Sequence, residues 1–145
     1  MPVLSIIQRI ASHVRDKVID HHPNPFGECI SASHALGILY QKAGLDVQLV
    51  EGHVMVSNTE MYHWWVEVED WLVDVTADQF DDDDNYFGDI VILIPSEATQ
   101  WRQTKKFQDV EFSLSCICGQ DANNARRYSR GFSKKKLRKH NSEVA

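Results

Sequence analysis

The sequence lacks an apolar run of about 18 residues, the length that a membrane-spanning helix needs. It also lacks, near its N-terminus, the basic, apolar and small-residue order of a secretory signal peptide. Its three cysteines are an odd number, which fits a reducing compartment better than a disulfide framework and leaves at least one thiol free to react. These absences argue against a membrane-spanning or disulfide-stapled protein, and we expect a cytoplasmic chain with no membrane partner.

The composition excludes two further classes, fibrous repeats and wholesale disorder. Of the 145 residues, 43% are hydrophobic and 25% are charged, which is ordinary globular usage, and no internal repeat is present. The length fits one domain that buries roughly two-thirds of the surface exposed by its unfolded chain.

Charge is divided unevenly along the sequence. Residues 120–145 hold eight Lys or Arg against two carboxylates, a balance of +6, whereas the whole chain carries −6, so residues 1–119 carry −12. The C-terminal stretch has few large apolar residues, which predicts a tail that is flexible or forms a weak helix. We therefore expect a domain over residues 1–119, a boundary near Gly119 and a basic tail over residues 120–145. Such a tail could bind nucleic acid or an acidic protein surface, or could be a solvated tail without a partner.

The spacing of apolar residues predicts two helices followed by a sheet. Apolar residues recur every three or four positions over residues 3–18 and again over residues 29–43, as on the buried face of a helix. Gly44 stands where a left-handed cap would end the second helix. Strand-like runs follow at residues 47–56, 62–68, 71–75 and 90–94. This order predicts an α+β fold with N-terminal helices packed on an antiparallel sheet.

The stretch MYHWWVEVEDWLVDVTADQF, residues 61–80, predicts a hairpin with polar groups among its apolar residues. With a two-residue turn at Glu69 and Asp70, one face of the hairpin is entirely apolar. The other face carries His63 and Asp74 as diagonal neighbours, within reach of each other. One face can therefore build the core while the other orients an imidazole beside a carboxylate.

Cys29 has the position of a reactive cysteine. It follows the helix-breaking segment HHPNPFGE and opens the second predicted helix, where unpaired backbone N–H groups and the helix dipole favour a thiolate. An imidazole held by Asp74 could serve that thiol as general acid and base. Backbone N–H groups at the same helix start could stabilise an oxyanion. Cys29, His63 and Asp74 thus have complementary chemistry for attack on a carbonyl.

The stretches GECISASHALGILYQKAGLDVQLVEGH and HWWVEVEDWLVDVTADQF resemble the core of the transglutaminase-like, papain-like cysteine enzymes. The resemblance covers residues 25–89 and keeps the order of nucleophile, histidine and aspartate. It implies that Cys29 is the nucleophile, His63 the general acid and base, and Asp74 the orienting carboxylate, with no cofactor. Relatives include peptidases, peptide N-glycanases, transglutaminases, acyltransferases and inactive members, so the substrate stays open.

The sequence departs from the family pattern around the expected site. Papain-type peptidases place a glutamine ahead of the cysteine as an oxyanion donor, whereas Asn24 is the only side-chain amide in the corresponding segment here. Tyr62, Trp64 and Trp65 flank the histidine and are candidates to line the substrate site.

Other possible ligand groups are weaker. The acidic run at residues 81–84 lacks the Gly and the Glu of an EF-hand loop, so a solvated loop is the simpler interpretation. Cys116 and Cys118 would need two further ligands to hold zinc. Four histidines share no common ligand spacing: His21, His22, His34 and His53. The sequence therefore predicts no metal site.

The leading prediction is a thiol-dependent acyl-transfer enzyme that hydrolyses an amide or peptide bond through a thioester. Its substrate would be a peptide, a protein or a small amide. Two alternatives stay open: transfer of the acyl group to an amine on the same triad, or an inactive binding or regulatory module that uses the aromatic hairpin and the basic tail. A buried structural cysteine and histidine would belong to the second alternative.

Overall fold

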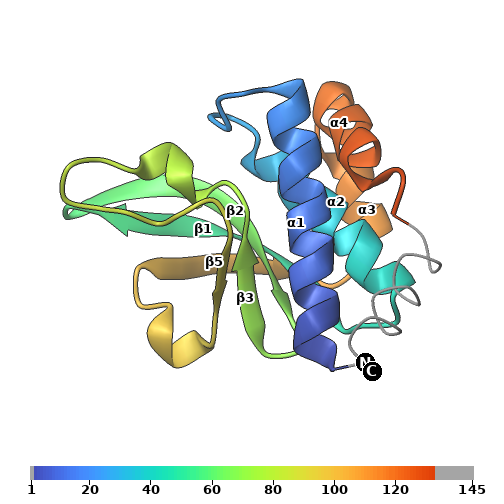
Figure 1. The fold of residues 1–145 in the computed structure, drawn as a ribbon, viewed down its shortest axis with the longest axis horizontal. Coiled ribbons are helices and arrows are strands. Elements are labelled where there is room, and N and C mark those ends of the chain that lie inside the picture. Colours follow the sequence, from blue (N-terminus) through green and yellow to red (C-terminus); the bar gives the residue numbers. More distant parts are fainter. Residues whose placement is uncertain (1, 133–145) are drawn as a thin grey trace.

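The computed structural model describes residues 2–132, which form an α+β fold with helices on one side of a five-stranded antiparallel sheet (Figure 1). The predicted fold class is confirmed. The helices are α1 (Val3–His21), α2 (Cys29–Lys42), α3 (Val110–Cys116) and α4 (Gly119–Ser129). The strands are β1 (Val47–Val56), β2 (Thr59–Val68), β3 (Trp71–Asp74), β4 (Val91–Leu93) and β5 (Trp101–Phe107), in the spatial order β4-β3-β2-β1-β5. Two short 3-10 helices are η1 (Ala77–Phe80) and η2 (Pro95–Glu97).

The two N-terminal helices form where the apolar pattern predicts them. α2 is buried along most of its length and packs on α1, on α4 and on the sheet. It ends before Gly44, whose φ of +80° gives the predicted left-handed cap. Within residues 2–132, no helix combines the length and the hydropathy that crossing a membrane requires. The buried face of α1 carries Ile7, Ile10, Ala11, Val14 and Val18.

β2 and β3 form the predicted hairpin in the predicted register. Glu69 and Asp70 have φ values of 46° and 68°, the left-handed pair of a type I′ turn that matches the twist of the flanking strands. Val68 pairs with Trp71, so the side chains fall on the expected faces. β2 begins at Thr59, earlier than expected, because a second tight turn joins it directly to β1.

Both faces of this hairpin are covered. Val66, Val73 and their neighbours on the apolar face pack against the helices in the larger core. The opposite face carries Trp65 and Leu72, which form a second buried cluster with residues from η1, β4 and the segment before β5. A polar group on that face is therefore enclosed by protein.

The C-terminal part of the structure differs from the expected tail, which was predicted to be flexible or weakly helical and to lie outside the domain. Residues 119–129 form α4, which packs against α2 and α1, so the folded part of the chain extends beyond the expected boundary near Gly119. α4 packs closely because Ala122 and Ala125 are small, and Tyr128 supplies a large buried ring. This contact gives the sequence no broad apolar stripe. Residues 133–145, which hold most of the basic cluster, lie outside the described residues.

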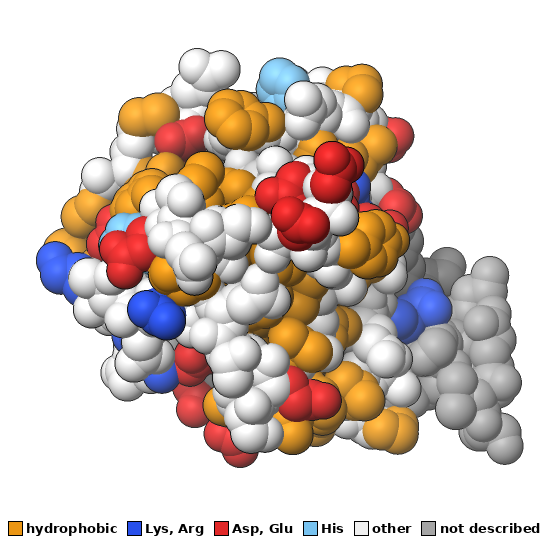
Figure 2. Space-filling view, turned by 90° about the vertical axis from the view of Figure 1, so that its left-hand side faces the viewer, with side chains coloured by type: hydrophobic (Ala, Val, Ile, Leu, Met, Phe, Trp, Pro, Cys, Tyr) orange, Lys and Arg blue, Asp and Glu red, His pale blue; other side chains and the backbone are white. Residues whose placement is uncertain are grey.

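The surface carries the acidic excess of the sequence. On the face shown in Figure 2, acidic side chains gather in a cluster beside hydrophobic surface, and Lys and Arg side chains are fewer. Asp82 shapes part of the acidic run at residues 81–84, because its Oδ1 accepts hydrogen bonds from the backbone N–H groups of Asp84 and Asn85. This carboxylate therefore stabilises a turn, as expected for a solvated loop.

Candidate active site

His63 and Asp74 form a buried hydrogen-bonded pair on adjacent strands. The Nε2–H of His63 donates to Oδ2 of Asp74 over 2.8 Å, and the two side chains are 0% and 1% exposed. The hairpin register brings them together diagonally, as the sequence predicted. Because Nε2 is engaged by the carboxylate, Nδ1 is the ring nitrogen left to exchange a proton with another group.

Asp74 is held by two further partners. Trp101 of β5 donates its indole N–H to Oδ2 over 3.0 Å, and the backbone N–H of Thr76 donates to Oδ1 over 3.0 Å. Burial alone would raise the pKa of Asp74, but the charge of His63 and these hydrogen bonds outweigh burial and lower it. The carboxylate is therefore kept ionised inside the protein.

Cys29 lies beside the same imidazole. It is half-buried and is the first residue of α2, where the side chain of the capping residue Glu28 makes no hydrogen bond to the helix N–H groups. Burial would lower the pKa of His63, but the charge and hydrogen bond of Asp74, with a hydrogen bond and charge from Cys29, raise it to about 10. The structure thus brings together the three residues that the sequence singled out.

Gln79 reaches the site from η1 and was missed by the sequence analysis. The backbone N–H of Gly27 donates to its Oε1 over 3.3 Å, which fixes the orientation of the amide and leaves Nε2 3.3 Å from Nδ1 of His63. The neighbouring Asp78 anchors η1 to α1 through two hydrogen bonds of 2.7 Å from Arg15. The only sequence signal was a side-chain amide shortly after Asp74 in a segment with no periodic pattern.

The hydrogen bond between Gln79 and His63 depends on the protonation state of the histidine. When His63 is neutral, its Nδ1 accepts a hydrogen bond from the Gln79 amide. When the proton of Cys29 has moved to Nδ1, the imidazolium can no longer accept a hydrogen bond, and the Gln79 amide is released from it. Proton transfer from Cys29 to His63 therefore frees the Gln79 amide to donate a hydrogen bond elsewhere.

The four residues predicted to line the site have different positions. The Asn24 side chain is exposed, and its Oδ1 accepts a hydrogen bond of 3.0 Å from the backbone N–H of Phe26, so it shapes its own turn. Tyr62 is 53% exposed, and its pKa is raised chiefly by partial burial and by its hydrogen bond to Glu51, with the charge of Cys29 as a smaller cause. Trp64 packs in the core, and Trp65 is buried on the face that carries His63.

Phe26 adds a second exposed aromatic side chain close to Cys29 in sequence. It is 70% exposed and lies in the loop that leads into α2. Tyr62 and Phe26 are thus the exposed aromatic residues on the two segments that carry His63 and Cys29. The sequence analysis passed over Phe26 because it treated residues 21–28 as a helix breaker.

The remaining candidates do not join this site. His34 is fully buried, with Nδ1 2.7 Å from the Ile30 carbonyl oxygen and Nε2 2.7 Å from the Ser113 hydroxyl, so it bridges α2 and α3. Cys116 and Cys118 are exposed thiols at the end of α3 and the start of α4. The Cys118 thiol donates a hydrogen bond to Oδ2 of Asp121 over 3.3 Å, and Cys116 Sγ lies 3.9 Å from the Ser115 hydroxyl, so both cysteines are exposed thiols without a histidine partner in these hydrogen bonds.

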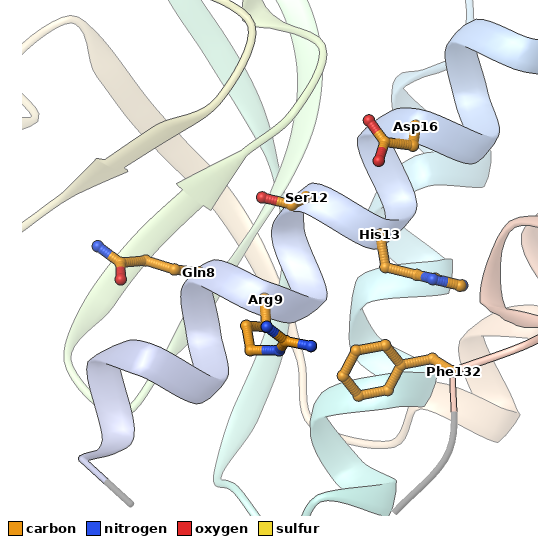
Figure 3. A pocket seen from close by; sticks show the side chains of 6 residues that line it. All are labelled: Gln8, Arg9, Ser12, His13, Asp16 and Phe132. Carbon is orange, nitrogen blue, oxygen red and sulfur yellow. The ribbon is translucent and has the colours of Figure 1, made fainter. Parts of the chain in front are cut away.

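A surface hollow lies elsewhere, along α1. Figure 3 shows it between the helix and the segment after α4, without any of the three triad residues. Its volume is about 340 Å³. The hollow is lined by Gln8, Arg9, Ser12, His13, Asp16 and Phe132.

Comparison of the chain with protein-family models, with curated protein sequences and with solved structures found no match. The functional argument therefore rests on the chemistry and geometry of the site itself.

Proposed function

We propose that this protein is a thiol-dependent acyl-transfer enzyme with a papain-like, transglutaminase-like core, and that it hydrolyses an amide or peptide bond. The observation that carries the proposal is the buried 2.8 Å hydrogen bond between His63 and Asp74, formed beside the thiol of Cys29. A carboxylate, an imidazole and a thiol in that order form the proton path of a cysteine nucleophile.

The reaction begins with a proton transfer from the Cys29 thiol to Nδ1 of His63. The thiolate attacks the substrate carbonyl carbon, and the C–O π electrons move to the oxygen to give a tetrahedral oxyanion. His63 then returns its proton to the leaving amine as the C–N bond breaks, which leaves a thioester on Cys29. Water gives a proton to His63 as it attacks the thioester carbonyl, and the resulting intermediate collapses with cleavage of the C–S bond. His63 returns the proton to the sulfur of Cys29 as the carboxylic acid leaves.

The oxyanion would receive hydrogen bonds from two donors. One is the backbone N–H of Cys29 at the start of α2, where the helix dipole also favours negative charge. We assign the second role to the Nε2 of Gln79 rather than to Asn24. Gln79 contacts both His63 and the segment before Cys29, and protonation of His63 frees its amide before the thiolate attacks and the oxyanion forms.

The substrate would dock on an open surface with an aromatic edge. Support comes from the exposure of Tyr62 and Phe26, and from the only partial burial of Cys29. Such a surface suits a side chain or segment of a peptide or protein, or a small amide. Hydrolysis is favoured over transfer to an amine because the aromatic residues next to Cys29 are exposed to water rather than enclosing the thiol.

An acyl-enzyme experiment tests the proposal. The protein is incubated with p-nitrophenyl acetate and analysed by intact-mass and peptide mass spectrometry. We expect one acetyl group on Cys29, with a burst of p-nitrophenol that is lost in Cys29→Ala and retained in a Cys116→Ser/Cys118→Ser variant. Acetylation that is spread equally over the three cysteines, or that persists without Cys29, would reject the proposal.

A further inference from the structure

Three metal-ligating side chains meet between the end of α1 and the start of α2. His21 is the last residue of α1, His22 follows it, and Glu28 precedes α2. One ligand atom from each of the three lies within 4.8 Å of the other two. Among residues 2–132, this is the place where three such groups of His, Cys, Asp or Glu converge. The sequence analysis missed it because the loop that closes the cluster has no ligand spacing of its own.

Glu28 is an unusual carboxylate because it is buried without a fully charged partner among the contacts of the described residues. Its side chain is 9% exposed, and Nε2 of His22 lies 3.6 Å from its Oε1. The Tyr128 hydroxyl donates a hydrogen bond to the same oxygen. A buried carboxylate is costly unless it is neutralised, and a hydroxyl and a half-exposed imidazole neutralise it only in part. Arg127 contacts His21 rather than Glu28, so a bound cation would place a positive charge in direct contact with the carboxylate.

We propose that His21, His22 and Glu28 bind a divalent transition-metal ion of the zinc type, with an open position for water. Two imidazoles and one carboxylate form a common donor set for such ions. Zinc–ligand distances of about 2.0–2.2 Å place the ligand atoms roughly 3.3 Å apart in a tetrahedral site, so the cluster must contract. The His22 side chain is 50% exposed and can rotate toward the other two ligands. The ring centroids of His21 and His22 are already 4.4 Å apart, in an edge-to-face arrangement.

Two neighbours on α4 shape this site in opposite ways. The Arg127 guanidinium contacts the ring nitrogens of His21 and occupies the space that a cation would take. Arg127 is exposed, so it can swing into solvent when an ion binds, at a cost in affinity. The Tyr128 hydroxyl donates a hydrogen bond to the Glu28 carboxylate and orients it, as outer hydrogen-bond partners of metal ligands do. Removing the guanidinium should therefore strengthen metal binding, which distinguishes this cluster from a casual pair of surface histidines.

The metal would join α1 to α2 one residue before Cys29, but its binding does not depend on the proposed acyl transfer. Titration calorimetry with Zn²⁺ on the untagged full chain, with Cys116 and Cys118 changed to Ser, is the test. The affinity should fall at least about tenfold in His22→Ala, because even outer-shell changes cost 10–100-fold. It should rise several-fold in Arg127→Ala and stay unchanged in His53→Ala, which removes a histidine from outside the cluster.

Cobalt absorption and folding controls complete the experiment. Co²⁺ should give visible d–d bands without a thiolate-to-cobalt charge-transfer band, and thermal unfolding in EDTA should show that each variant remains folded. Zinc affinity that is the same in His22→Ala as in the parent would overturn the proposal. Weaker binding in Arg127→Ala, or a thiolate band that assigns the ion to Cys29, would also overturn it.

Discussion

His63 is buried, yet its surroundings favour the charged imidazolium. Burial works against the charge, while Asp74 and Cys29 more than compensate and raise the pKa of His63 to about 10. Three hydrogen bonds, from His63, Trp101 and Thr76, hold the Asp74 carboxylate next to the imidazole. Strongly shifted pKa values of buried groups cluster at functional sites, and this motivates the proposed chemical role of the pair.

The first prediction concerns the pH dependence of stability. The folded pKa of His63 lies above its ordinary 6.5, so the pair stabilises the fold fully below about pH 6.5 and loses this contribution as the pH rises through about 10. The folded pKa of Asp74 lies below its ordinary 3.8, so on the acid side the contribution is present above that value and is lost as the pH falls through the folded pKa. Urea denaturation should show a fall in the free energy of unfolding between pH 7 and pH 10.

The same measurement in His63→Ala supplies the control. The alkaline fall should be markedly smaller in this variant, because one pKa unit corresponds to about 1.4 kcal/mol of differential stabilisation. An equal alkaline fall in both proteins would show that His63 is not charged in the fold at neutral pH.

Gly52 allows strands β1 and β5 to approach each other closely. A Cβ at Gly52 would lie 2.2 Å from the carbonyl oxygen of Arg102 on β5 and 2.7 Å from the Trp65 ring. The register of β1 and β5 shifts between Glu51 and Gly52, which marks a bulge at this point. The close approach therefore holds the edge strand, including Trp101, in place next to Asp74.

We predict that Gly52→Ala lowers stability by about 1–3 kcal/mol or more, because the backbone of β5 must move to make room. Gly119→Ala is a matched control, since a Cβ there meets nothing within 4 Å and alanine favours the first turn of α4. Chemical denaturation of both variants makes the comparison. Equal effects of the two substitutions would show that the β1–β5 contact is looser than described.

The elements that could be predicted are those with a local signal. The hairpin of β2 and β3 follows from period-two alternation and a two-residue turn, and its register then places His63 next to Asp74. β5 has no such signal, because its residues are mostly exposed at the sheet edge. Trp101 and Gln79 reach the site only through long-range packing, which a local pattern does not encode. The packing of α4 into the domain was not predicted, because small side chains, rather than a broad apolar stripe, make its contact.

For the whole molecule, α4 decides where the folded domain ends. Tyr128 and Ala125 are fully buried against the helical layer, and Tyr128 hydrogen-bonds to Glu28 at the start of α2. We predict that a chain ending at Gly119 loses about 3 kcal/mol or more, or fails to unfold cooperatively, because α2 is left with an exposed apolar face. A chain ending at Phe132 should retain cooperative thermal unfolding. Equal stability of the two truncated proteins would contradict the packing of α4.

The basic residues after Phe132 leave three alternatives open: binding to nucleic acid, binding to an acidic protein surface, or a solvated tail without a partner; either kind of binding would weaken as the salt concentration rises. These alternatives concern residues 133–145 and are separate from the chemistry of Cys29. The chain ending at Phe132 therefore serves both questions, since it should keep thiol chemistry while losing any binding that belongs to the tail.

An activated Cys29–His63 pair that is oriented by Asp74 should be visible in the rate of iodoacetamide labelling of Cys29 measured against pH. Peptide mass spectrometry follows Cys29 and, in the same molecules, the exposed reference thiols Cys116 and Cys118. We expect fast labelling of Cys29 near pH 6 that is lost in His63→Ala and reduced in Asp74→Ala, and that exceeds the labelling of Cys116 and Cys118 at the same pH. A pH profile of Cys29 labelling that matches those of Cys116 and Cys118, and that neither substitution changes, would show that His63 does not activate Cys29.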